Sequence, residues 1–105
     1  MTLEEFHALL VGTGFPVAYR QFKRAPKSIP YIVYYSDASD NFEADNQVFH
    51  EVENIMVELY TEQKDPAAEQ KVKTVLSENG LPFERFESWI KEESLLLNSY
   101  ETRFL

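Results

Sequence analysis

The chain has 105 residues, of which 44% are hydrophobic and 14% aromatic, and its formal net charge is −8. The length suits one domain, and the apolar content exceeds that of a disordered acidic tail, so we expect a single folded domain over residues 1–105. The negative charge argues against stable binding to nucleic acid or to a membrane surface, since both depend on Lys and Arg. The absence of cysteine excludes disulfides and thiolate metal sites.

A membrane-spanning helix needs about 18 consecutive apolar residues, and no stretch of the sequence approaches this length. The first predicted helix is also too polar for a signal peptide. We therefore expect a soluble protein that is made in the cytoplasm of its host cell.

The first predicted element is a helix from Thr2 to Val11. Thr2 can cap it, and Leu3, Phe6 and Leu10 recur on one face, which predicts packing against another element.

Three prolines lie between residues 15 and 30, which predicts an extended segment that ends in an irregular basic loop. The aromatic and β-branched run 31–35 predicts a strand. Residues 36–46 mix Asp, Asn and Ser, which predicts a loop or a hairpin connection.

A long strand is predicted over residues 47–61, because apolar side chains alternate along it. One face carries Ile55, Val57 and Leu59, and the other carries Val52, Met56 and Tyr60.

Asp65 and Pro66 then begin the clearest helix, which ends at Asn79 and Gly80. Its apolar side chains fall at helical spacing: Ala68, Val72, Val75 and Leu76. Glu69 and Lys73 are spaced to form an ion pair on its surface.

Two further strands are predicted over residues 83–90 and 95–104. Consecutive strands with short connections favour antiparallel pairing. We therefore expect an α+β fold in which two helices pack on one face of a mostly antiparallel sheet of four to five strands. In its core, we expect the Ile55 face of the long strand to contact Val72, Val75 and Leu76.

Charge is segregated along the chain. Residues 28–63 contain eight acidic residues and neither Lys nor Arg, whereas residues 20–27 contain four of the ten positive charges. Complementary charged surfaces steer association and fix its register, which predicts an interface between subunits. The alternative is that both segments are ordinary solvated faces. The predicted interface comprises Arg20, Lys23, Arg24 and Lys27 of one subunit and Asp37, Asp40, Glu43 and Asp45 of its neighbour.

The sequence carries no recognisable catalytic pattern. His7 and His50 are far apart and lack partners at metal-ligand spacing. The acidic residues between 37 and 45 lack the oxygen pattern and the glycine of a calcium loop. No glycine-rich phosphate loop or nucleophile elbow occurs. We therefore expect no enzyme activity, no cofactor and no metal.

One feature favours nucleic acid, because several aromatic side chains near the basic segment could stack on bases. These residues are Tyr19, Phe22, Tyr31, Tyr34 and Tyr35. We interpret them instead as core or sheet cover, since the charge of the whole chain opposes a phosphate ligand.

Several short motifs resemble small proteins that phages and prophages of Gram-positive bacteria encode in their head-to-tail joining region. The likeness covers residues 16–100. It rests on the segments Pro30-Tyr-Ile-Val-Tyr34, Asp40-Asn-Phe42, Ala44-Asp-Asn46, Glu58-Leu-Tyr-Thr61, Lys64-Asp65 and Glu69.

The resemblance is to tail terminator and tail-completion proteins, small α+β subunits that close a ring, typically a hexamer, on the tail tube. It implies a homo-oligomer that contacts tail-tube and head-completion proteins, assembles in the host cytoplasm and ends in the virion tail or the head-tail junction. Terminator, head-completion and minor tail proteins remain open as exact roles. A second hypothesis is a cytosolic acidic adaptor or inhibitor that binds a basic partner or mimics nucleic acid, and a third is a small hydrolase-like enzyme.

Overall fold

A computed structural model describes residues 1–44 and 47–104 of the chain, and the side chains of residues 1–36 and 54–104. The chain folds in the order α1 (Leu3–Val11), β1 (Val17–Tyr19), β2 (Tyr31–Ala44), β3 (Gln47–Thr61), α2 (Pro66–Glu78), β4 (Phe83–Ile90) and β5 (Leu95–Phe104). This is the order that the sequence predicts.

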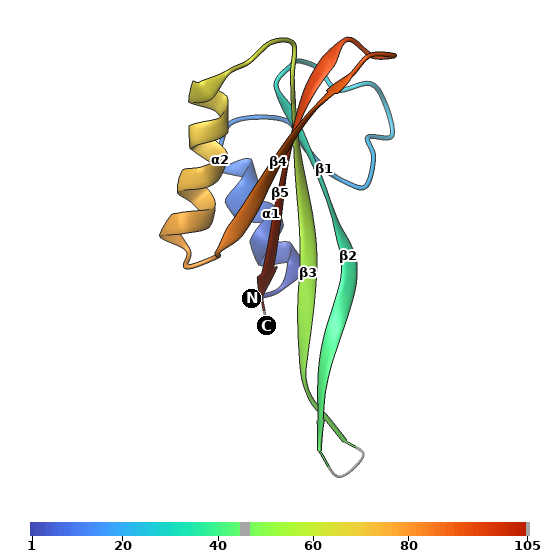
Figure 1. Ribbon diagram of the computed structural model, residues 1–105, viewed down its shortest axis with the longest axis vertical. Coiled ribbons are helices and arrows are strands. Elements are labelled where there is room, and N and C mark those ends of the chain that lie inside the picture. Colours follow the sequence, from blue (N-terminus) through green and yellow to red (C-terminus); the bar gives the residue numbers. More distant parts are fainter. Residues whose placement is uncertain (45–46, 105) are drawn as a thin grey trace.

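The strands form one five-stranded sheet in the order β1-β2-β3-β5-β4. β1 pairs with β2 in parallel, and every other neighbouring pair is antiparallel. Both helices lie on the same side of this sheet (Figure 1). The α+β prediction, with two helices on one face of a mostly antiparallel sheet, is therefore confirmed.

Both helices begin at the capping residues that the sequence predicts. Thr2 Oγ1 accepts a hydrogen bond from the Glu5 main-chain N at 3.1 Å, and the Glu5 carboxylate accepts one from Thr2 N at 2.9 Å. This reciprocal pair is a capping box. At α2, Asp65 accepts a hydrogen bond from Ala68 N at 3.0 Å and Pro66 occupies the first turn. Each cap satisfies main-chain donors that the helix itself leaves unpaired.

The core lies between the helices and the sheet. Leu59 of β3 stands opposite Ile32 of β2 and Asn98 of β5, so the three side chains share the face that the helices cover. The centre of this core is fully buried and comprises Phe6, Leu10, Ile32, Ile55, Val57, Leu59, Val72, Leu76 and Tyr100. The predicted contact between β3 and α2 is confirmed for five of its six residues, whereas Val75 is partly exposed and lies outside the core cluster.

Of the two alternatives predicted for residues 36–46, the structure contradicts a loop over residues 36–44, because β2 continues through them to Ala44. It agrees with a hairpin, because β2 and β3 pair antiparallel as far as Ala44 and Gln47. Pairing with β3 holds these polar residues in an extended backbone, and two register shifts, after Ser36 and after Phe42, accommodate them. Asp, Asn and Ser have low strand propensity, but a paired neighbouring strand overrides it. The connection itself, at residues 45–46, lies outside the described residues.

β2 and β3 run on beyond the rest of the sheet as a two-stranded ribbon. β3 pairs with β5 only from Glu53 onwards, so in the described chain residues 47–52 of β3 pair with β2 alone. We call residues 38–44 and 47–52 the acidic ribbon. It projects away from both helices and gives the molecule its longest dimension of 50 Å (Figure 1).

Candidate functional site

The four basic residues of the predicted interface lie in the loop between β1 and β2, residues 20–30, which we call the basic loop. Arg20 differs from the other three because the sheet holds it in place. Its guanidinium lies 5.7 Å from the ring centre of Tyr19 and 5.4 Å from that of Tyr35. Its Nη2 also donates a hydrogen bond to the Ser36 carbonyl at 3.2 Å. Arg20 therefore anchors the start of the loop to β1 and β2.

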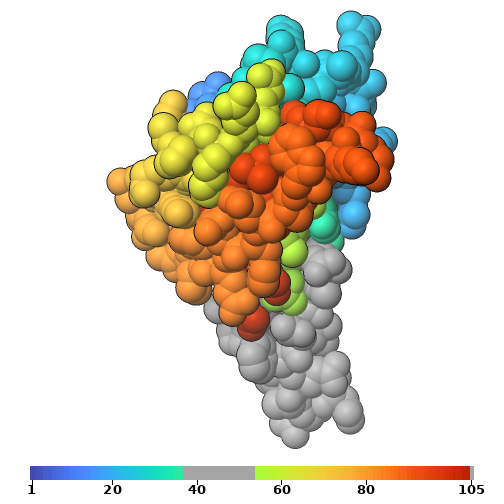
Figure 2. Space-filling model, turned by 45° about the horizontal axis from the view of Figure 1, so that its top comes forward, coloured from blue at the N-terminus to red at the C-terminus, as the bar shows by residue number. Residues whose placement is uncertain are grey.

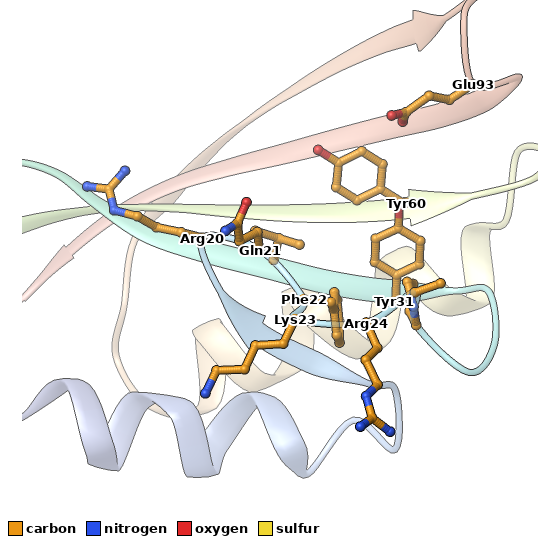
Figure 3. Close-up of a pocket in the computed structure, with 11 residues that line it drawn as sticks. Arg20, Gln21, Phe22, Lys23, Arg24, Tyr31, Tyr60 and Glu93 are labelled. Carbon is orange, nitrogen blue, oxygen red and sulfur yellow. The ribbon is translucent and has the colours of Figure 1, made fainter.

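Lys23, Arg24 and Lys27 are exposed, and none of them forms an ion pair with another residue that the structure describes. In the close-up of the loop, the side chains of Lys23 and Arg24 extend away from the aromatic rings of the sheet (Figure 3). These three cations are therefore available to an acidic partner.

Beneath the basic loop lies a group of stacked aromatic rings on the face of the sheet that the helices leave open. Tyr31 and Tyr60 stack with ring centres 4.9 Å apart, and Phe22 from the loop meets Tyr31 edge-on at 5.5 Å. A cavity of about 320 Å³ opens between these rings, the loop and Glu93 of the β4–β5 turn. Figure 2 shows this turn, in orange-red, beside the blue and cyan segments of the N-terminal third.

Burial raises the pKa of the Tyr60 hydroxyl well above its usual value, and the neighbouring Glu58 carboxylate adds to the shift. Tyr60 donates a hydrogen bond to Glu58 Oε1 at 3.0 Å. Burial likewise raises the pKa of Tyr31, assisted by Glu93 and Glu58. Both hydroxyls are therefore protonated at ordinary pH, and the contact of Phe22 with Tyr31 connects the loop to the sheet. The sequence predicts Tyr31 as sheet cover, whereas its stacking on Tyr60 follows from the pairing of β2 with β3.

The acidic half of the predicted interface lies elsewhere in the molecule. Asp37, Asp40 and Glu43 are on β2, and Asp45 lies outside the described residues. The acidic ribbon points away from the end of the molecule that holds the basic loop (Figure 1). One subunit therefore does not bring its basic loop and its acidic ribbon together, although Arg20 at the start of the loop binds the carbonyl of Ser36, the residue before Asp37.

A cluster of charged side chains that sequence analysis did not predict joins α2 to β4. The Glu69 side chain is only 4% exposed, and Lys64 Nζ lies 2.9 Å from each of its carboxylate oxygens. Lys64 also binds Glu87 Oε1 at 2.7 Å, and this hydrogen bond is the main cause of its raised pKa. The expected surface pair of Glu69 with Lys73 is wrong, because Glu69 is buried and bound by Lys64.

This cluster continues into the core through Arg85, whose Nη1 donates a hydrogen bond to the buried Asn98 Oδ1 at 2.8 Å. The sequence does contain a signal for it. Glu69 lies three residues before Val72 and seven before Leu76, and this spacing places it on the buried face of the helix. The cluster is closed by its own ion pairs, which fits a structural connection between α2 and β4.

Of the two histidines, His7 lies on α1, half-buried, with its Nδ1 2.9 Å from the Tyr34 hydroxyl. His50 lies on β3, and its side chain is outside the described residues. Among the side chains that the structure describes, no group of three or more His, Asp or Glu residues could hold a metal ion.

Comparison with known proteins finds no protein-family model and no curated protein that matches this chain. Neither helix of the described chain has the length and apolar character required to cross a membrane.

Proposed function

We propose that this protein is a structural subunit of a phage or prophage that forms a ring at the tail terminus or the head-tail junction and catalyses no reaction. One observation carries the proposal, namely the separation of the basic loop from the acidic ribbon within an elongated subunit. The resemblance of residues 16–100 to tail terminator and tail-completion proteins supports the same role.

A basic patch and an acidic patch that cannot meet in one subunit can meet between two, and such a contact joins different surfaces of the two copies. Contacts of this head-to-tail kind generate a closed ring when the rotation between subunits closes. Exposed ion pairs contribute only about 0–1 kcal/mol each, so these charges act mainly on the rate and register of assembly.

In this proposal the ring is a homo-oligomer, expected to be a hexamer, that contacts the tail-tube and head-completion proteins. It assembles in the host cytoplasm and remains in the virion tail or the head-tail junction. The acidic adaptor or inhibitor is the competing function, and the same ribbon would then bind a basic protein of another kind.

The experiment is a mass measurement on the purified protein alone and with purified tail tubes. We expect a closed oligomer of about six subunits, alone or at the ends of the tubes. A monomer that neither oligomerises nor binds tubes would contradict the proposal. Binding of that monomer to a basic protein would favour the adaptor.

A further inference from the structure

A groove lies on the other side of the basic loop from the stacked rings of Tyr31 and Tyr60. It has a volume of about 670 Å³ and lies between the C-terminal end of α1, β1 and the loop. Its lining combines an apolar floor with positive charges, namely Val11, Phe15 and Phe22 with Lys23, Arg24 and Lys27. The Val11 side chain is 51% exposed although it is aliphatic. The groove is thus an apolar surface bordered by cations.

The charges that line the groove favour an occupant of negative charge. Lys23, Arg24 and Lys27 have no ion-pair partner among the described residues, and none of the residues that line the groove is acidic. A further cation, Lys71 of α2, lies 5.2 Å from the ring centre of Phe15. An occupant that matches both features presents an apolar side chain flanked by carboxylates.

The acidic ribbon has that composition. On β2, Phe42 has Glu43 directly after it and Asp40 two residues before it, with no Lys or Arg in between. The ribbon also carries Phe49 on β3, in the part of that strand that pairs with β2 alone. An isolated two-stranded ribbon is marginally stable in water, and a contact with a second copy would stabilise it.

The geometry of one subunit excludes its own ribbon as the occupant. The groove lies at the basic-loop end of the molecule, and the ribbon projects from the other end (Figure 1). The six residues 47–52 of β3 extend the ribbon by about 20 Å beyond the sheet, which is a suitable reach for a neighbour.

We propose that the groove between α1, β1 and the basic loop binds the acidic ribbon of a second copy of this chain. Phe42 enters over Val11, Phe15 and Phe22, and the flanking carboxylates meet the three lysine and arginine side chains at the rim. The apolar contact supplies affinity, and the charges set register. This inference rests on the proposed self-assembly and names the contact that joins one subunit to the next.

Cross-linking tests the contact directly, since the chain has no cysteine of its own. Two full-length variants, Val11→Cys and Ala44→Cys, are mixed under oxidising conditions. We expect a disulfide-linked pair containing one of each. Ser88→Cys, on the exposed edge of β4, is the control partner and should give no such product with Val11→Cys. Equal yields from Ala44→Cys and Ser88→Cys would overturn the inference.

A second pair of variants tests the anchor. Phe42→Ser should weaken self-association at least about tenfold, the effect expected from losing one buried aromatic side chain. Phe86→Ser is matched, because Phe86 is 52% exposed on β4, and it should associate like the parent. Circular dichroism checks that both variants fold. If Phe42→Ser does not fold, the cross-linking experiment alone decides whether the contact forms.

The two proposals fail in different ways. Rings that form without the cross-link and tolerate Phe42→Ser would overturn the groove contact while leaving ring assembly intact. If the cross-link forms but the protein never binds tail tubes, the result would support the groove contact and contradict the proposed role at the tail.

Discussion

Replacing Leu59 by Ala tests the packing on which the whole fold depends. Leu59 is fully buried on the helix-covered face of β3, between Ile32 and Asn98 of the neighbouring strands. The substitution removes three buried carbon atoms, which is about 2.4 kcal/mol at about 0.8 kcal/mol each. The cavity that remains adds to this cost, so we expect the free energy of unfolding to fall by about 2 to 5 kcal/mol.

Urea unfolding followed by circular dichroism measures this loss, at several protein concentrations so that association does not enter the result. Leu97→Ala is the matched control, since Leu97 lies on β5, partly exposed on the face that no helix covers. It should cost clearly less than Leu59→Ala. A loss below about 1 kcal/mol at Leu59, or equal losses at both positions, would show that the assignment of the two sheet faces is wrong.

Two further predictions concern a helix cap and the buried tyrosines. Asp65→Ala removes the acceptor for Ala68 N and should lower the free energy of unfolding by about 1 kcal/mol in urea, whereas an unchanged midpoint would mean that the cap is not formed. Burial raises the pKa of Tyr60 and Tyr100 in the folded protein, so the unfolded chain loses these protons first as pH rises. Their contribution to stability is therefore complete below about pH 10 and declines above it, and Tyr60→Phe should reduce the decline in urea midpoint. If the urea midpoint of Tyr60→Phe falls with pH as steeply as that of the parent, burial of Tyr60 is not the cause of the decline.

Local sequence signals were sufficient for most of the fold. Helix caps and a two-residue period are local patterns, so the sequence alone identifies the structure that they form. The caps at Thr2 and Asp65 mark the two helix starts, and the alternation of Ile55, Val57 and Leu59 marks a strand. The sequence shows less clearly which strands pair with each other. The extension of β2 to Ala44 depends on pairing with β3, and polar residues in a strand give no local sign of it.

The candidate site shows the same division. The charges of the basic loop and the acidic segment are evident from composition, but their placement at opposite ends of the subunit follows from the ribbon. The groove was not predicted, because Val11, Phe15 and Phe22 come from three different segments that only the fold brings together. Burial of Glu69 was missed because its spacing from Lys73 also suits a surface pair.

The most direct measurement of the central claim uses two charge-reversed variants that complement each other. Lys23→Glu with Arg24→Glu places two carboxylates in the loop and removes its net positive charge, and Asp40→Lys with Glu43→Lys makes the ribbon basic. In each variant alone, the charges of the loop and the ribbon no longer complement each other, so it should assemble poorly. In an equal mixture, the reversed loop can meet the reversed ribbon and the unchanged loop the unchanged ribbon, so rings of alternating subunits should form. The mass is measured at low salt with tail tubes present, and circular dichroism confirms that each variant is folded. Rings from the mixture but not from either variant alone are the predicted result. Assembly of each variant as well as the parent, or no assembly of the mixture when the parent assembles, would contradict the claim that the basic loop of one subunit binds the acidic ribbon of the next.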